Sequence, residues 1–403
     1  MKGAYTLMRR DFSTEQFQHF VENLKDSFRG DLQGQTRRAL EAILKADSEQ
    51  QMEKHIGLKW HERPAEGERR IDYRNGCYVR NYVTPVGTIQ VQVSRTRQRS
   101  FLPQGIRALE RRSPEVAELI RQAFLRGIST RAVGRVVALL TEERVSAQTV
   151  SRLTQALDGA VRAFHTAPLD DDWAYLIFDG VWIKVRRSFG PQRVLLLVVY
   201  GVRPNGERQL LAFVRARGES QAAWEGFLFS LVERGLRGQQ LQLIITDGCP
   251  GLAAAIQVMY AGVLHQRCWV HKMRNLGEGV RRRDREAVKR DAQKIYRAPG
   301  LREARQAFGY FQQQWQGVYP RLVRRLAQDL PELLHFYAFP RPLWKKLRTT
   351  NAIERCFVEV RRRTRPMVVF TNVASVDRII YAIFSRFNEE WRNRTLKIFT
   401  HAA

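Results

Sequence analysis

The sequence predicts an α/β protein built on a mixed sheet with flanking helices, interrupted by an all-helical insertion and preceded by a helical region that includes a small β-hairpin. Apolar runs of strand length alternate with helical periodicity between residues 170 and 275. Residues 276–345 are helix-forming throughout, and the N-terminal part is polar with apolar residues at helical spacing. With 403 residues and 44% hydrophobic composition, the chain can bury more than one core.

Residues 1–110 are expected to form the N-terminal helical region and the hairpin. Apolar residues occur at helical spacing in segments 17–24 and 40–44, but the purpose of this lead-in is not evident. Between residues 76 and 103, Ile89, Val91 and Val93 follow a glycine and alternate with polar residues, which predicts a β-hairpin. The arginines after it either contact DNA phosphates or lie in a solvated loop.

Residues 111–165 contain a candidate helix-turn-helix. Capping and turn signals predict three helices, at residues 115–126, 131–140 and 146–157. The third would present Gln148, Thr149 and Arg152 to base edges in the major groove, as recognition helices do. Three short helices in a row are also ordinary packing, so both interpretations stay open.

Residues 170–275 are predicted to be the first part of a catalytic core. Strands are expected at residues 175–185, 194–202 and 209–215, with Gly-Pro and Pro-Asn-Gly turns between them. A helix at 220–234, a short strand at 241–246, a helix at 252–260 and a last strand at 263–270 follow. Three hairpin-linked strands followed by alternating helix and strand are the layout of the RNase H-like fold.

Residues 276–345 form the predicted helical insertion, and residues 346–403 complete the core with two helices separated by residues 366–371. The insertion is rich in aromatic residues and strongly basic at Arg281, Arg282 and Arg283. Such a basic run is a candidate DNA contact.

The net charge limits the classes of binding partner. The chain has 68 Lys+Arg against 40 Asp+Glu, a formal net charge of +28, spread from end to end. This charge attracts polyanions, DNA included, although ribosome or membrane-surface binding without chemistry is an alternative on charge alone. Four scattered cysteines indicate a reducing compartment, and no apolar run is long enough for a signal peptide or a membrane span. A soluble, intracellular protein is expected.

Three acidic residues stand in distinctive sequence contexts: Asp179 in a strand, Asp247 after a short apolar strand, and Glu354 at the start of a helix. Asp-Gly after an apolar run often marks only the end of a strand, so each acid alone is weak evidence. Together they suggest a two-metal phosphoryl-transfer site, because carboxylates are the ligands that Mg²⁺ prefers. The basic run after Glu354 would face phosphates through Arg361, Arg362, Arg363 and Arg365.

Four phrases carry a family resemblance over residues 70–390: the segment 175–186, Ile245-Thr-Asp-Gly248, Gln266-Arg-Cys-Trp-Val-His-Lys-Met-Arg-Asn275, and Thr350-Asn-Ala-Ile-Glu354 with its basic run. The chain resembles bacterial insertion-sequence transposases of the Mutator type, which are DDE transposases with an RNase H-like core. The resemblance implies a metal-binding catalytic triad of Asp179, Asp247 and Glu354. The neighbouring motif residues are Cys268, His271, Arg274, Asn275 and Asn351.

The resemblance further implies two Mg²⁺ ions per site, replaceable by Mn²⁺, and double-stranded DNA as partner, both terminal inverted repeats and target. It implies a homo-oligomer, at least a dimer, in the bacterial cytoplasm and associated with the nucleoid, with no membrane partner. The expected reaction is end cleavage followed by strand transfer. The alternatives are a nuclease of the same fold that never joins strands, and a domesticated, non-catalytic DNA-binding protein.

Two departures from the family pattern and two smaller expectations complete the prediction. Many relatives have Asn where this chain has Phe357, and Phe-Pro where it has residues 261–263. Cys268 and His271 are too few for a structural zinc site, so a corner beside the active site is expected instead. Trp182 and Trp269 are expected in the core, with stacking on an unpaired base as the alternative.

Overall fold

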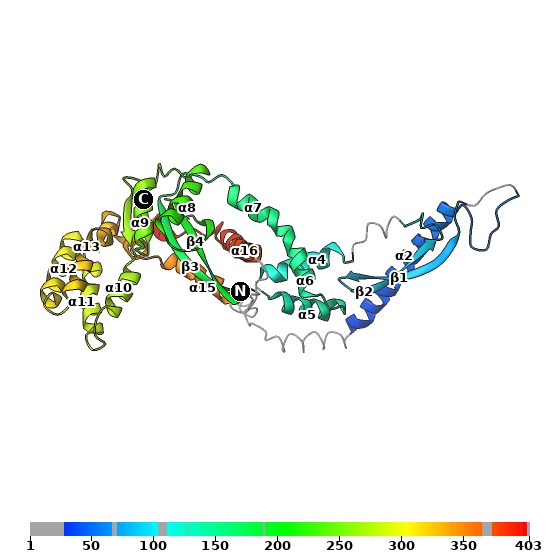
Figure 1. Cartoon of the computed structure of the whole chain (residues 1–403), viewed down its shortest axis with the longest axis horizontal. Coiled ribbons are helices and arrows are strands. Elements are labelled where there is room, and N and C mark those ends of the chain that lie inside the picture. The colour runs from blue at the N-terminus through cyan, green and yellow to red at the C-terminus, as the bar shows by residue number, and fades with distance from the viewer. Residues whose placement is uncertain are drawn as a thin grey trace, which may run out of the picture. The chain divides into compact units, whose positions relative to one another are not determined.

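The chain folds as two units, which meet in the sequence at Ala156 and Leu157. The computed structural model describes residues 28–66, 71–103, 111–126, 128–187, 190–364 and 373–400 (Figure 1). Within these ranges, no helix is both long and apolar enough to cross a membrane.

The first unit begins with a long helix and a β-hairpin. Helix α2 covers Phe28–Ile56, and strands β1 (Arg74–Thr84) and β2 (Gly87–Thr96) pair antiparallel. The alternating residues Ile89, Val91 and Val93 are buried, and Leu40 and Leu44 of α2 pack against them. The predicted hairpin is therefore confirmed, whereas the helical spacing at residues 17–24 lies outside the described part of the chain.

Three short helices follow at the predicted positions: α4 (Pro114–Leu125), α5 (Thr130–Thr141) and α6 (Ala147–Thr154), with a 3-10 turn at Gln155–Leu157. Each begins after a serine whose side chain accepts a backbone N–H of the first turn, namely Ser113, Ser129 and Ser146. Such caps satisfy donors that have no partner inside the helix. The three predicted helices are confirmed.

Replacing Gly134 of α5 by alanine is expected to destabilise the first unit. An added Cβ would lie 2.1 Å from the Val145 carbonyl oxygen, which is backbone and cannot rotate away. Overpacking of this kind costs about 1–3 kcal/mol, which exceeds the ~1 kcal/mol that alanine gains over glycine inside a helix. Thermal unfolding followed by circular dichroism measures the change. Gly309→Ala in α12 (Leu301–Trp315) is the control, because nothing lies within 4 Å of its added Cβ, and it is expected to stabilise.

The second unit opens with α7 (Asp158–Thr166) and contains a five-stranded mixed sheet in the order β5-β4-β3-β6-β7. Strands β3 (Tyr175–Arg187), β4 (Gly190–Val202) and β5 (Arg208–Ala216) are antiparallel. Strands β6 (Leu243–Thr246) and β7 (Leu264–Arg267) extend the sheet in parallel with β3. Helices α8 (Gln221–Glu233) and α9 (Pro250–Met259) lie between strands in sequence, as predicted.

One predicted strand is too long. Residues 263–270 were expected to form it, but β7 ends at Arg267, and Trp269 and Val270 begin helix α10 (Trp269–Glu278). A short apolar run gives the same signal for a buried strand and for the first turn of a buried helix. Arg267 is the last residue of the strand, and Cys268 is the N-cap of helix α10.

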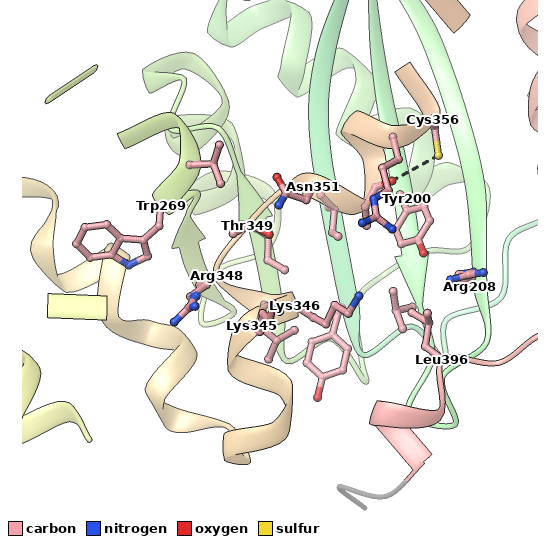
Figure 2. A pocket seen from close by; sticks show the side chains of 18 of the residues that line it. Tyr200, Arg208, Trp269, Lys345, Lys346, Arg348, Thr349, Asn351, Cys356 and Leu396 are labelled. Carbon is pink, nitrogen blue, oxygen red and sulfur yellow. Dashed lines mark hydrogen bonds between the residues drawn. The ribbon is translucent and has the colours of Figure 1, made fainter. Parts of the chain in front are cut away.

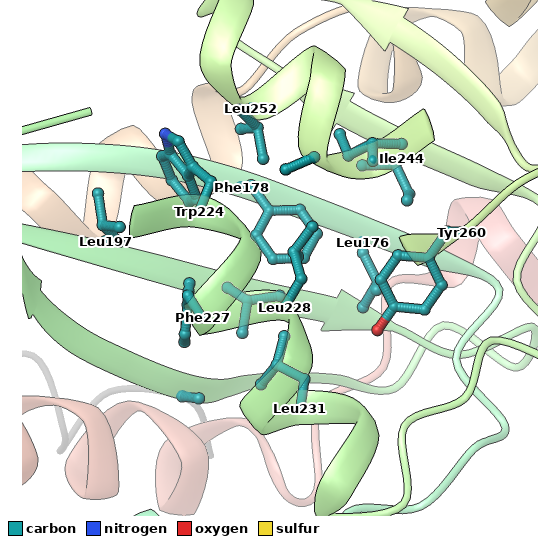
Figure 3. Close-up of a cluster of buried hydrophobic side chains, with 14 of the residues drawn as sticks. Leu176, Phe178, Leu197, Trp224, Phe227, Leu228, Leu231, Ile244, Leu252 and Tyr260 are labelled. Carbon is teal, nitrogen blue, oxygen red and sulfur yellow. The ribbon is translucent and has the colours of Figure 1, made fainter. Parts of the chain in front are cut away.

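The two faces of this sheet differ. One face carries helix α15 (Asn351–Thr364) on β3 and helix α16 (Val373–Trp391) on β5, and beside them a hollow that Tyr175 and Ile177 help to line (Figure 2). The other face carries α8 and α9 over the main hydrophobic cluster, to which Leu176 and Phe178 belong (Figure 3). Because side chains alternate along a strand, Asp179 lies on the α15 face with Tyr175 and Ile177.

The predicted insertion is helical throughout, which confirms that expectation. It consists of α10, α11 (Arg285–Arg297), α12, α13 (Pro320–Leu334), the 3-10 turns His335–Ala338 and Arg341–Leu343, and α14 (Trp344–Leu347). Gln266 of β7 fastens it to the sheet, since its amide donates to the Leu333 carbonyl (3.0 Å) and accepts from the Phe336 N–H (2.8 Å).

The C-terminal part contains the two expected helices, α15 and α16, followed by α17 (Lys397–Thr400). The predicted separator, residues 366–371, lies outside the described residues. Trp269 is buried, as expected, and its indole N–H donates to the Leu333 carbonyl. The prediction for Trp182 was wrong, because its side chain is 46% exposed. Trp182 lies on the same face of β3 as Leu176 and Phe178, but it stands farther along the strand and is not part of their cluster.

Candidate active site

Asp179 lies within β3 and is nearly enclosed, with 6% of its surface exposed. Its Oδ1 accepts a hydrogen bond from the N–H of Gly180 at 2.8 Å. A buried carboxylate that has so little hydrogen bonding is costly unless a cation or a proton compensates it.

Asp247 follows the adjacent strand β6. Ile177 of β3 pairs with Ile245 of β6, so Asp179 and Asp247 each stand two residues beyond the same paired position. Adjacent strands run about 4.8 Å apart, which brings the two acids side by side. The Oδ1 of Asp247 accepts a hydrogen bond from the N–H of Cys249 at 2.9 Å. This local contact forms a turn that leads the chain into α9.

Glu354 comes from the first turn of α15, more than a hundred residues later in the sequence. Its Oε1 lies 3.3 Å from the Nε2 of His271, on α10. The two helices therefore bring the third acid and the motif histidine together beside the strands.

Electrostatics link all four groups. Burial raises the pKa of Asp179, the charge of Asp247 raises it further, His271 opposes the shift, and Glu354 adds to it. The pKa of His271 is raised by its interaction with Cys268, against the effect of burial, and by the charges of Asp179 and Glu354. Asp179 thus lies within electrostatic reach of Asp247, Glu354 and His271, while the role of the three acids as a metal-binding triad stays a prediction.

Cys268 and Thr350 form the corner that holds these helices. Cys268 is fully buried, and its sulfur accepts the N–H of Thr350 at 3.3 Å and lies 3.5 Å from the Thr350 hydroxyl. The residue before α10 is thereby tied to the residue before α15. Among the described residues, no group of three or more His, Cys, Asp or Glu side chains is placed to hold a metal ion, and this includes Asp179, Asp247 and Glu354 as they stand here.

Glu219 is a fourth acid that sequence reasoning missed. Its Oε1 lies 2.9 Å from where a Cβ on Gly180 would stand, next to Asp179. Burial raises the pKa of Glu219, and so does the charge of Asp247. An acid just before a helix N-cap is common on any helix, because it suits the helix dipole, so the sequence offered no distinguishing signal.

The remaining predicted residues fall into several environments. Arg274 and Asn351 are exposed and line the hollow beside α15, and Asn275 is exposed on α10. Gln148, Thr149 and Arg152 of the first unit line a polar hollow on α6. Arg281, Arg282, Arg283 and Arg362 are exposed, and Arg361 is half-buried. Arg363 is 4% exposed and pairs with Glu359 at 2.7 Å, which makes it a packing residue; Arg365 lies outside the described residues.

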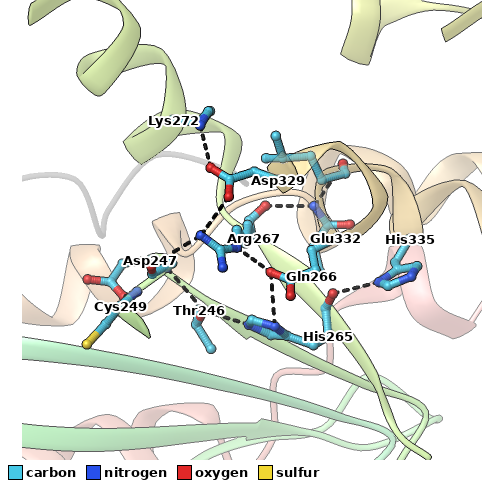
Figure 4. A network of polar contacts seen from close by, with 12 residues as sticks. Thr246, Asp247, Cys249, His265, Gln266, Arg267, Lys272, Asp329, Glu332 and His335 are labelled. Carbon is cyan, nitrogen blue, oxygen red and sulfur yellow. Dashed lines mark hydrogen bonds and ion pairs between the residues drawn. The ribbon is translucent and has the colours of Figure 1, made fainter. Parts of the chain in front are cut away.

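A polar network stands directly behind Asp247 (Figure 4). Arg267, at the end of β7, pairs with Asp329 (3.1 Å) and with Glu332, both on α13. Lys272 of α10 also pairs with Asp329, and the Arg267 guanidinium reaches the Gly248 carbonyl at 3.5 Å. The network joins the insertion to the turn that carries Asp247.

Acidification is expected to weaken the second unit through Glu332. Burial favours the protonated form, but hydrogen bonds from His265 and Arg267 outweigh it and lower the pKa of Glu332 to about 2. Because the folded pKa lies below the unfolded value, the stabilisation is present above pH ~4.5 and is lost as the pH falls toward 2. Urea unfolding of wild type and Glu332→Gln at pH 6 and pH 3 measures this. The variant is expected to be weaker by about 1–2 kcal/mol at pH 6, after allowance for solvent screening, and by roughly half of that or less at pH 3, where the folded-state carboxylate is still mostly ionised.

Comparisons with known proteins identify the family of this chain. Residues 12–394 match the family model described as Transposase, Mutator family. The chain is 31% identical over 330 residues to the transposase for insertion sequence element IS905 of Lactococcus lactis, which covers 82% of this chain and 83% of that protein. It is 32% identical over 339 residues to the IS406 transposase of Burkholderia multivorans, covering 83% and 86%.

A third relative extends over nearly the whole length. The transposase for IS256 in transposon Tn4001 of Staphylococcus aureus is 29% identical over 382 residues, 94% of this chain and 95% of that protein. The family match spans both units and includes all four acids described above. This chain therefore belongs to the Mutator family of transposases.

Proposed function

We propose that this protein binds the terminal inverted repeats of an insertion sequence, cuts the DNA at the element ends and joins the freed 3′-hydroxyls to target DNA. The proposal rests on one observation. Asp179, Asp247 and Glu354 come from three distant segments, and the charges of Asp247 and Glu354 both act on the buried carboxyl group of Asp179. The strand order and the helix that supplies Glu354 support an RNase H-like core.

The chemistry of these side chains suits divalent cations such as Mg²⁺ or Mn²⁺, although the carboxylates as they stand here are not placed to hold an ion together. Three carboxylates, with Glu219 as a fourth nearby, offer only oxygen ligands and carry excess negative charge. Asp179, Asp247 and Glu354 would hold two ions, with Glu354 turning from His271 toward the strands. When bound, such ions lower the pKa of an attacking water or hydroxyl and stabilise the oxygen that leaves phosphorus.

The protein's own residues then position the reacting strand. His271, whose pKa is raised, keeps a proton on the imidazole that faces Glu354 and can donate it as a hydrogen bond to a phosphate oxygen. The Cys268–Thr350 contact fixes the start of both helices, so the histidine and the glutamate keep their relative places. Positioning and electrostatics supply most of the catalysis in phosphoryl transfer.

DNA recognition would involve both units. The charge of +28 provides non-specific attraction, which we expect to fall steeply with salt. Gln148, Thr149 and Arg152, on the capped helix α6, form the polar surface suited to reading base edges. Because two element ends must be cut together, the working form would be a homo-oligomer, at least a dimer.

The test is a reaction of the full-length protein with DNA that carries the element's own ends, a target plasmid and Mg²⁺ or Mn²⁺. Joined products that require the metal are the expected result. Cleavage without joining would identify a nuclease, and specific binding without either product would identify a DNA-binding regulator.

A further inference from the structure

The hollow beside α15 is a large cavity (Figure 2). Its volume is about 840 Å³, near the upper end of the range for ligand sites. Its floor includes Ile177 and Ile245, which stand two residues before Asp179 and Asp247 in the sequence. Its walls include Asn351 and Arg274, on the helices that carry Glu354 and His271.

The charge of this cavity is entirely positive. Seven of its described lining residues are Lys or Arg, and none of them is Asp or Glu. Four of these cations are exposed, and their side chains form no ion pair or hydrogen bond among the described residues: Arg274, Lys345, Lys346 and Arg355. Cations that are gathered without neutralising partners attract a polyanion.

Aromatic rings give the cavity its second property. The Arg208 guanidinium lies 4.8 Å from the Trp391 ring centroid. The Arg348 guanidinium lies between two rings, 4.8 Å from the centroid of Tyr296 and 5.9 Å from that of Phe336, and donates to the Tyr296 carbonyl. The Nε of Arg208 is buried and has no hydrogen-bond acceptor among the described residues. Planar guanidinium groups backed by rings are surfaces on which a nucleobase stacks, and an unsatisfied donor suits a phosphate oxygen.

We propose that this cavity binds an unpaired segment of the DNA strand that leads away from the scissile phosphate, toward Arg208 at the other end of β3 and β4. Bases in a duplex are stacked on each other and show only their edges in the grooves, so they cannot stack on Arg208. Unpaired nucleotides expose both base faces and phosphates together. The proposal rests on the proposed function and adds that the ends are held with nucleotides separated from the duplex.

The experiment measures affinities of the full-length protein for a fluorescent single-stranded oligonucleotide, for the same strand in a duplex and for a strand of abasic nucleotides. The charge variant is Lys345→Gln/Lys346→Gln. Its matched control is Arg302→Gln/Arg305→Gln on α12, which removes two charges outside the cavity lining. Arg208→Lys keeps the charge but removes the planar surface.

The charge variant is expected to weaken single-strand binding about tenfold and to reduce the salt slope by about 1.4, since each single-strand phosphate contact contributes ~0.7. The control is expected to leave the preference for single strand over duplex unchanged. Arg208→Lys should weaken binding of the normal strand by roughly 5- to 150-fold, the equivalent of one stacked base, and should leave abasic binding and the salt slope unchanged.

The proposal would be overturned if the cavity variant and its control lost single-strand affinity equally. It would also be overturned if Arg208→Lys lost as much affinity for the abasic strand as for the normal strand. A variant whose circular dichroism differs from wild type is replaced by the single changes Lys345→Gln and Lys346→Gln, to which the same criteria apply. Single-strand binding needs no cleavage, so these outcomes stand whether or not the protein cuts DNA. Loss of cleavage with the cavity effects intact would count against the proposed function alone.

Discussion

Asp247→Asn is expected to lower the rates of DNA cleavage and joining by at least about 1,000-fold. The change removes one carboxylate from a site that acts by binding metal ions and stabilising charge. DNA affinity should stay within about twofold of wild type, since the phosphate contacts that dominate binding lie elsewhere. Gel-based cleavage and joining assays, run beside equilibrium binding to the same end DNA, measure both quantities. Asp170→Asn is the control, because Asp170 is an exposed carboxylate paired with Arg203 on the same unit.

Asp179→Asn should cause the same loss of activity and also raise the thermal stability of the metal-free protein. The side chain is 6% exposed and faces two other acids, so a neutral side chain of the same shape removes a buried like-charge repulsion. Active sites commonly hold such strain at the expense of stability. Cleavage that survived in both variants would show that the acids are not the catalytic groups.

Arg267→Met is expected to weaken the second unit by about 2 kcal/mol, because it leaves two partly buried acids of α13 without their main partner. Arg267, Asp329 and Glu332 are 21%, 23% and 26% exposed, so solvent screening keeps the loss below that of a fully buried pair. Cleavage should fall by about tenfold or more, since the turn that carries Asp247 loses its support and small misplacements are costly in catalysis.

A matched variant separates the two effects of Arg267. Arg203 also pairs with three acids, Asp170, Asp172 and Glu207, and is 23% exposed, but it lies at the opposite end of the sheet from the acidic site. Arg203→Met should lower the unfolding temperature with little change in cleavage. Equal activity losses in the two variants would show that Arg267 contributes only general stability.

Much of the fold of both units could be predicted because their local signals agree with their topology. Strand-length apolar runs, proline and glycine turns and serine caps marked the elements, and the alternation of Ile89, Val91 and Val93 marked the hairpin. The acids could be predicted because each stands in a phrase that matches the family. Their grouping was a separate inference, which the shared electrostatic site of Asp179, Asp247 and Glu354 supports.

The features that escaped prediction depend on contacts between distant segments. Glu219 approaches Asp179 only because the chain after β5 passes over Gly180, and nothing near residue 219 records that approach. Arg363 stands in an exposed-looking basic run, yet helix rotation turns it inward to Glu359. The cavity beside α15 draws its lining from strands, the insertion and the C-terminal helices, so no single stretch of sequence describes it.

The most direct test of a two-metal site is anomalous X-ray diffraction from crystals of the protein bound to its end DNA and soaked in Mn²⁺. Two anomalous peaks roughly 3.5–4 Å apart, between the carboxylates of Asp179, Asp247 and Glu354, are expected, with Glu354 turned away from His271. Mn²⁺ peaks elsewhere, or none at these carboxylates when the DNA is bound, would contradict it.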